Sequence, residues 1–349
     1  MLTIDGARHS GSGTIVRQAV GLAALTGRAV RIVNVRVRRP KPGLRPQHVQ
    51  VVEAIRQLVD GQAEGVCLGS REFTFCPGDA SGGGRYVWDI GSAGSTTLLT
   101  LAVLPVLAFG SVPARIEVRG GVFQDFAPSF YHLRDVVLPM VRRMGLEAEV
   151  EMGRPGYVPR GEGIIVVRVS PVRSPLRPVV LNQQGAVQRV WGIALASHLK
   201  AQRVSQRMAE AGEGMFRAAG YHAEIKAQDD NTALQPGAAF AAFADLSGGM
   251  RLGADRAGAP GRPAEAIGNQ VAEQLLEDLR LGAILDRYAA DQVILFSTLA
   301  AGISRFRVPY VTEHILASAW MAQEFLGAAV CPQGDELVIH GVGFRGLKQ

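Results

Sequence analysis

The chain repeats one order of structural elements, and this repeat limits the folds open to it. A turn containing Gly and Ser leads into an apolar helix, and a strand and a second helix follow. The first pass predicts a helix at 14–25, a strand at 30–35 and a helix at 48–58, and the second predicts a helix ending near 109, a strand at 114–118 and a helix at 128–143. The third predicts a helix at 290–300, a strand at 305–308 and a helix at 312–326. Such alternation predicts sheets covered by helices.

Residues 176–275 separate the second pass from the third. They predict strands at 186–194, 221–226 and 238–243, a helix at 201–219, and exposed connections at 229–231 and 253–263. We therefore expect an α/β fold of the layered α+β kind. Three βαβαβ-type units would form one large domain from residues 1–175 and 276–349, with residues 176–275 as a small inserted α+β domain.

Composition argues against membrane, exported and metal-scaffold proteins. No apolar run reaches the length of about 20 residues that a membrane-spanning helix needs, and the first residues carry no export signal. Cys67, Cys76 and Cys331 show no metal-binding spacing, and three cysteines are too few for a disulfide scaffold. We expect a cytoplasmic protein without a membrane partner, and the sequence leaves the oligomeric state open.

The segment 28–45 concentrates positive charge on a chain whose formal net charge is +6. It contains seven cations and no carboxylate: Arg28, Arg31, Arg36, Arg38, Arg39, Lys41 and Arg45. Prolines stiffen its second half, which lowers the entropy lost on binding, and arginine can grip phosphate oxygens with two N–H groups. The segment is either a phosphate- or RNA-binding surface or a solvated basic face.

Two stretches rich in Gly and Ser, 5–13 and 91–95, precede apolar helices, the first of which carries Arg17. Glycines let a backbone approach a phosphate closely, and a helix N-terminus offers N–H donors. Neither stretch matches the P-loop or the dinucleotide-binding motif. A plain turn with capping residues is therefore the alternative for both.

Two groups near the C-terminus suit nucleotide chemistry. His314 starts the helix predicted at 312–326, where it is either a helix cap or a neutral imidazole competent as a nucleophile. Tyr288, Asp291 and Gln292 share one face of a helix. They could bind a purine and its ribose, or pack a helix start against a loop. No paired-histidine spacing indicates zinc.

Together these residues resemble the RNA 3'-terminal phosphate cyclase family. The resemblance runs from Ile4 to about Val338, with the insertion included. Its strongest pieces are Lys41-Pro42-Gly43-Leu44 with Gln47-His48, Ile90-Gly91-Ser92-Ala93-Gly94-Ser95, Ala127-Pro128, Tyr288 with Asp291-Gln292, and His314. The family folds as three βαβαβ-type repeats with a small inserted domain, which agrees with the organisation expected above.

The resemblance implies an ATP-dependent ligase that converts an RNA 3'-phosphate to a 2',3'-cyclic phosphate. By position, His314 would form a covalent histidyl-AMP, AMP would pass to the RNA 3'-phosphate, and the 2'-OH would close the ring. Magnesium or manganese would offset charge on the triphosphate, with no protein ligand assigned. The residues implied around the nucleotide are Arg17, Pro128, Phe130, Tyr288, Ala289, Ala290, Asp291 and Gln292, and those implied to bind phosphate or RNA are Arg36, Arg39, Lys41, Arg45, Gln47 and His48.

Three places depart from the family pattern. Ser10 stands where the family has a metal-holding Glu, Leu101 stands where a Gln contacts the nucleotide, and the signature at 156–163 is altered. A second hypothesis is therefore a cyclase-like RNA-binding or RNA-processing protein with weak or lost catalysis. A third, with less support, is a small-molecule transferase of the related enolpyruvyl-transferase architecture.

Overall fold

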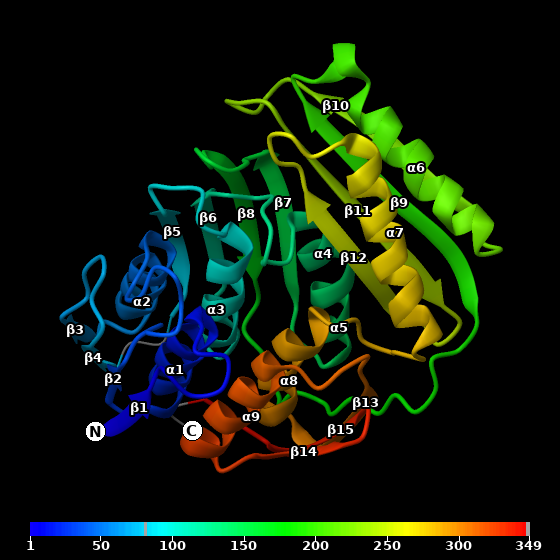
Figure 1. Ribbon diagram of the computed structural model, residues 1–349. Coiled ribbons are helices and arrows are strands. Elements are labelled where there is room, and N and C mark those ends of the chain that lie inside the picture. The colour runs from blue at the N-terminus through cyan, green and yellow to red at the C-terminus, as the bar shows by residue number, and fades with distance from the viewer. Residues whose placement is uncertain (80–81, 347–349) are drawn as a thin grey trace.

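The computed structural model describes residues 1–79 and 82–346, and its larger part consists of three similar units (Figure 1). Unit 1 contains β1 (Leu2–Asp5), α1 (Gly13–Thr26), β2 (Val30–Val33), α2 (Pro46–Leu58), β3 (Gln62–Glu64) and β4 (Phe73–Cys76). Unit 2 contains β5 (Gly84–Asp89), α3 (Thr96–Ala108), β6 (Ala114–Gly120), a helix made of α4 (Phe130–His132), the π-helical η1 (Leu133–Val137) and α5 (Leu138–Arg143), and β7 (Ala148–Arg154) and β8 (Gly163–Val169). Unit 3 contains α8 (Ala289–Leu299), β13 (Ala301–Arg307), α9 (Glu313–Leu326), β14 (Ala329–Gln333) and β15 (Glu336–Val342). The predicted layered α/β fold is confirmed.

The three sheets share one topology. The strand orders are β1-β2-β4-β3 in unit 1 and β5-β6-β8-β7 in unit 2, with the first pair parallel and the other pairs antiparallel. Unit 3 has the order β13-β15-β14, and Val180 forms a parallel bridge with Arg305 where the other units have a first strand. Each unit therefore ends in an antiparallel pair of strands, where the sequence predicted a single strand.

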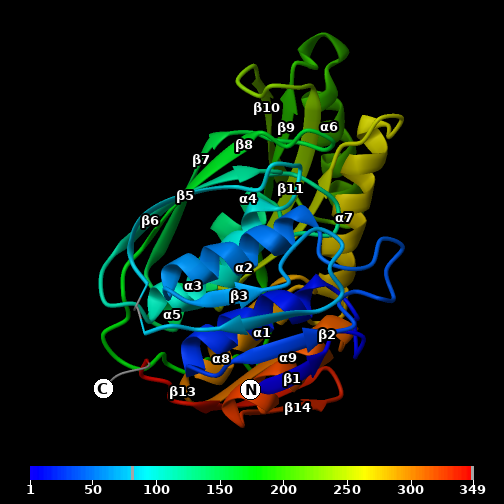
Figure 2. The same cartoon turned by 90° about the vertical axis from the view of Figure 1, so that its left-hand side faces the viewer.

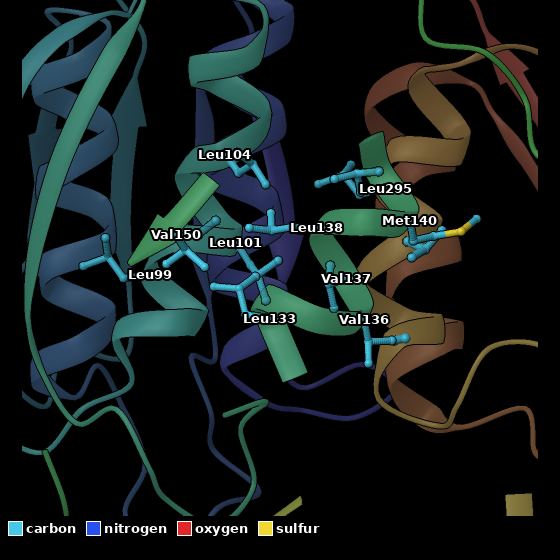
Figure 3. Packing of buried hydrophobic residues seen from close by; sticks show 14 of the residues in the cluster. Leu99, Leu101, Leu104, Leu133, Val136, Val137, Leu138, Met140, Val150 and Leu295 are labelled. Atoms are coloured by element: carbon cyan, nitrogen blue, oxygen red, sulfur yellow. The ribbon is translucent and has the colours of Figure 1, made fainter. Parts of the chain in front are cut away.

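The helices of the units lie together in the centre, and the sheets lie outside them (Figures 1 and 2). This position explains why α3 has no exposed polar face: its three threonines and its apolar residues are all buried. Figure 3 shows Leu101 and Leu104 of α3 close to Leu133 and Leu138 of the neighbouring helix of unit 2. An amphipathic helix would leave polar groups inside this contact, so the sequence of α3 matches its central place.

The inserted segment forms a sheet of its own with two helices packed on it (Figure 1). Its elements are β9 (Val187–Ser197), the short 3₁₀ helix η2 (Lys200–Gln202), α6 (Val204–Ala218), β10 (Ala223–Asp230), β11 (Gly237–Leu246), β12 (Arg251–Ala257) and α7 (Ala264–Arg280). The strand order is β10-β9-β11-β12. Residue 275, where we expected the insertion to end, lies inside α7.

Two predictions for this segment were wrong. The turn expected at 229–231 begins as the end of strand β10, where Asp230 pairs with Ser197. The connection expected at 253–263 begins as strand β12. Its glycine misled the prediction: a β-carbon at Gly253 would lie 2.8 Å from the side chain of Val136, so the glycine permits close packing within a strand.

Candidate functional site

A pocket of about 340 Å³ opens where the first helices of the three units begin. One part of its lining is polar: Thr14, Arg17, Arg287, Asp291, Gln292, Thr312 and His314. The other part is apolar or aromatic: Leu98, Phe126, Ala127, Pro128, Tyr288 and Tyr310. An apolar wall beside a few convergent polar groups is typical of a ligand site.

His314 lies in the first turn of α9, which Thr312 caps by accepting a hydrogen bond from Ile315 N at 3.1 Å. The Nδ1 atom of His314 is 3.1 Å from the Oγ1 atom of Thr14. The same hydroxyl accepts a hydrogen bond from Arg17 Nη2 at 3.1 Å. The contact occupies Nδ1 and leaves Nε2 as the ring nitrogen without an assigned partner among the described residues.

The surroundings of His314 favour its neutral form. Burial lowers the pKa of His314, and the positive charges of Arg17 and Arg39 lower it further. A neutral imidazole near pH 7 has a lone pair available on one nitrogen, so it can act as a nucleophile or a base.

Arg17 and Asp291 are opposite charges inside the same pocket. Burial lowers the pKa of Arg17 to about 10, although the negative charge of Asp291 opposes this shift. Burial raises the pKa of Asp291 to about 6, against a hydrogen bond from Gln292 and the charge of Arg17. Arg17 is therefore a cation at neutral pH and can face an anionic ligand.

A buried ion pair holds the start of α8, the helix that carries Asp291 and Gln292. Asp286 accepts hydrogen bonds from the backbone N atoms of Tyr288 at 3.0 Å and Ala289 at 2.8 Å. Its carboxylate oxygens lie 3.0 Å from His132 Nε2, and both side chains are fully buried. A further hydrogen bond from Gly253 N, at 3.0 Å, ties the pair to the inserted sheet.

A smaller cavity of about 20 Å³ lies where α1, α3 and α8 meet. Gln18, Leu101 and Gln292 each contribute to its lining, one from each helix. The Gln18 Nε2 atom donates to Ser318 Oγ at 2.7 Å, whereas its Oε1 atom is buried without a partner in the described part of the chain. The first helices of the three units therefore bring different groups to the same small cavity: the amides of Gln18 and Gln292 and the apolar side chain of Leu101.

The structure brings six of the predicted nucleotide-site residues to the pocket. They are Arg17, Pro128, Tyr288, Asp291, Gln292 and His314. Phe130, Ala289 and Ala290 are also among the predicted residues, but they are buried and do not belong to the pocket lining.

The predicted phosphate- or RNA-binding residues lie beside the pocket. Arg39 donates to Ser10 O at 3.2 Å, whereas Arg36 donates to Lys41 O and Gly43 O of its own loop. Lys41 and Arg45 are exposed. The loop therefore brings cations to the opening segment, and the charge of Arg39 reaches His314.

Gln47 and His48 have structural partners next to this loop. Gln47 Oε1 accepts from Ser95 N at 2.9 Å, and His48 Nδ1 accepts from Arg45 N at 3.1 Å. His48 is buried and packs against Gly13, where a β-carbon would lie 2.1 Å from its Nε2 atom. Both residues fix the relative positions of the first helices in units 1 and 2.

Sequence comparison decides the family of this chain. The family model described as "RNA 3'-terminal phosphate cyclase" matches residues 8–331. Relatives named RNA 3'-terminal phosphate cyclase include one from Pyrococcus furiosus, 34% identical over 99% of this chain and 97% of its own, and one from Methanopyrus kandleri, 37% identical over 96% of each chain. The chain belongs to the RNA 3'-terminal phosphate cyclase family.

A solved structure, the enolpyruvyl transferase NikO from Streptomyces tendae, is far more distant. It is 13% identical with a TM-score of 0.42, and the match covers all of this chain and half of that one. This likeness is too low to support an argument. Membership of the cyclase family therefore rests on sequence.

The family resemblance implied a metal-holding carboxylate where this chain has Ser10. The Oγ atom of Ser10 lies 2.9 Å from that of Ser12, so the two hydroxyls contact each other. Among residues 1–79 and 82–346, no group of three or more His, Cys, Asp or Glu side chains is arranged to hold a metal ion. The described side chains therefore do not fit a metal held by the protein alone.

In the described residues, none of the helices is both long and apolar enough to cross a bilayer.

Sequence reasoning missed several features of the site. The predicted site residues did not include the pair of His132 with Asp286, nor these residues of the pocket lining: Thr14, Leu98, Phe126, Arg287, Tyr310 and Thr312. His132 and Asp286 are 154 positions apart, so no local spacing could link them. Thr14 could have been found, because it directly follows the Gly-rich opening and starts the helix that carries Arg17.

Proposed function

We propose that this member of the cyclase family is an ATP-dependent ligase that adenylylates itself on His314 and converts an RNA 3'-phosphate to a 2',3'-cyclic phosphate. The observation that carries the proposal is the contact between Thr14 Oγ1 and His314 Nδ1 beside Arg17. In the proposed arrangement, Thr14 Oγ1 accepts from the Nδ1–H group of His314, which leaves the lone pair of the ring on Nε2.

The proposed reaction has three steps. His314 Nε2 attacks the α-phosphorus of ATP, so that an N–P bond forms and the P–O bond to the departing pyrophosphate breaks. An oxygen of the RNA 3'-phosphate then attacks the same phosphorus and releases His314. Finally the 2'-OH attacks the 3'-phosphorus, loses its proton to solvent, and expels AMP.

The pocket lining suits this use of ATP. Pro128 and Tyr288 supply a wall against which a purine can pack, and Arg17 supplies a cation for phosphate oxygens. Magnesium or manganese would arrive with the triphosphate, because Mg²⁺ is commonly held by one or two carboxylates together with substrate phosphates. Asp291 is the carboxylate that the pocket offers, and no step above depends on a metal held by protein alone.

Incubation with ATP labelled in its α-phosphate, with magnesium or manganese, tests the mechanism. Wild type should become labelled, and His314→Ala should lose the label completely because no other group replaces its Nε2 atom. His222→Ala is the matched control, since His222 is an exposed histidine of the inserted segment. Failure of wild type to form an adduct that depends on His314 would exclude self-adenylylation on this residue.

A second candidate function is RNA binding without efficient catalysis. The apolar Leu101 beside Gln18 and the hydroxyl contact of Ser10 favour it, because neither supplies the group that the family pattern would place there. RNA binding by wild type without adduct formation or cyclic ends would select this candidate.

A further inference from the structure

Phe126 combines two features that folding alone does not explain. The residue is 97% exposed, the highest value among the exposed large hydrophobic residues of the described chain. Its backbone has φ 65°, a left-handed conformation that is unusual for a bulky residue. Glycine or asparagine would adopt this conformation more readily, and residues held in it cluster at ligand sites.

Contacts on both sides fix the loop that carries Phe126. The preceding residue, Asp125, accepts hydrogen bonds from Arg262 at 2.9 and 3.2 Å and lies 3.3 Å from Arg256 Nε. After Phe126, the carbonyl of Pro128 accepts from Thr97 Oγ1 at 2.6 Å. The exposed ring is therefore presented by a restrained loop, which reduces the entropy lost when a ligand packs on it.

The ring lies in the lining of the pocket that contains His314. Arg17 and Asp291 belong to the interior of that pocket, where burial shifts the pKa of each. Phe126, being almost fully exposed, belongs to its rim. A ligand that occupies the interior leaves this ring available to a second molecule approaching His314 from solvent.

We propose that Phe126 is a stacking platform for the base of the 3'-terminal nucleotide of RNA. This inference rests on the proposed function, in which adenosine fills the interior and the RNA end must reach His314 across the rim. Proteins commonly bind unpaired RNA ends by stacking bases on aromatic side chains. A phenyl ring has no hydrogen-bonding group, so the platform accepts any base and distinguishes only the presence of a base from its absence.

Two RNA oligonucleotides test the platform directly. Both have the same sequence and a 3'-phosphate, but in one of them the terminal nucleotide is abasic. Their dissociation constants are measured by fluorescence anisotropy without ATP, using the full chain. Wild type should bind the RNA with the terminal base about 10- to 100-fold more tightly than the abasic RNA, the range expected for one base–aromatic stack.

Variants of Phe126 show whether this ring causes the preference. Phe126→Ala should bind the two RNAs equally, and Phe126→Trp should keep the preference because indole also stacks. The matched control is Val87→Ala, at a residue of β5 that is 60% exposed and lies outside the pocket lining. It should keep the wild-type preference. Because Phe126 buries little surface, Phe126→Ala should also keep the wild-type melting temperature.

Two results would overturn the assignment. One is an equal preference for the base in wild type and Phe126→Ala. The other is a Phe126→Ala protein that keeps the preference for the terminal base but has a raised KM for ATP in the adenylylation assay. This result would assign the ring to adenine. Since the binding assay contains no ATP, a base preference that depends on Phe126 in a protein that forms no His314 adduct would refute the proposed function alone.

Discussion

Helices α1 and α3 occupy the same position in two units of one fold, but they bring different side chains to the candidate pocket. At a spacing of about 83 residues, Ser12, Thr14, Arg17 and Gln18 correspond to Ser95, Thr97, Thr100 and Leu101. Both helices begin with a serine cap: Ser12 Oγ accepts from Thr14 N at 3.2 Å, and Ser95 Oγ accepts from Leu98 N at 3.1 Å.

Beyond the caps the two helices differ. Arg17 of α1 extends into the pocket and contacts Thr14, whereas Thr100 of α3 donates to Thr96 O within its own helix. The side chains that α3 offers to the two cavities are apolar, among them Leu98 and Leu101. Capping and core packing are thus common to both units, whereas groups suited to phosphate belong to unit 1. Unit 3 is a third version, in which the Asp286 carboxylate accepts hydrogen bonds from the backbone at the start of α8 and Asp291 lies in the pocket.

Among these residues, Asp286 at the start of α8 should contribute most to the stability of the fold. Asp286→Ala should lower the free energy of unfolding by about 3 kcal/mol or more, because it leaves His132 buried without its counter-charge and removes the acceptor for three backbone N–H groups. Urea denaturation at pH 6.5 measures the loss. Asp335→Ala is the matched control, since it removes a half-exposed ion pair with Arg307 and should cost less than about 1 kcal/mol. Equal losses would show that the buried pair has no special role.

The stability lost in Asp286→Ala should depend on pH. Burial lowers the pKa of His132, but Asp286 outweighs this effect and raises it to about 9. This part of the stability is fully present below the unfolded pKa of about 6.5 and is lost as pH rises through about 9. The stability difference between wild type and Asp286→Ala should therefore shrink from pH 6.5 to pH 10 in thermal melts. A constant difference would mean that His132 is neutral throughout.

Equivalent positions on α1 and α3 should differ in their effect on activity. Arg17→Met should slow formation of the His314 adduct about 100-fold, because it removes a fixed charge donor to the phosphates. Thr100→Val, at the corresponding position of α3, should leave the rate within about two-fold, since the Thr100 hydroxyl donates to Thr96 O of its own helix and Thr100 is not part of the pocket lining. Single-turnover labelling measures both rates. Similar rates for the two variants would remove the functional distinction between the units.

Removing the serine caps should have the smallest effects on stability, and the two losses should be nearly equal. Ser12→Ala and Ser95→Ala should each lower the free energy of unfolding by about 1 kcal/mol, the usual contribution of such a cap. Urea denaturation of the two variants in parallel tests the equivalence of the two helix starts. A loss at one position and none at the other would show that the units differ in packing as well as in chemistry.

The sequence predicted the central helices well because burial leaves a clear signal there. The apolar run before Phe109 became α3, and the predicted helix 312–326 became α9 with Thr312 as its cap. The short strands β3 and β7 gave no comparable signal, because strand pairing depends on partners elsewhere in the chain. Helix α7 was missed because its polar sequence follows a segment rich in Gly and Pro.

For the site, chain order and family likeness predicted residues whose type suits nucleotide chemistry, such as Arg17, Asp291 and His314. They could not predict the pair of His132 and Asp286, which joins unit 2 to the segment before α8. Phe126 also gave no signal, because its exposure and left-handed backbone are properties of the folded loop.

The cavity shared by Gln18, Leu101 and Gln292 has a consequence for how such a protein can change. In a symmetric homotrimer one gene specifies all three subunits, so any substitution near the rotation axis appears three times. An arginine introduced there would place three like charges together. Here one polypeptide contains all three units, so a single mutation changes a residue in only one unit. Mutation could therefore alter the polarity of one helix while the other two kept theirs.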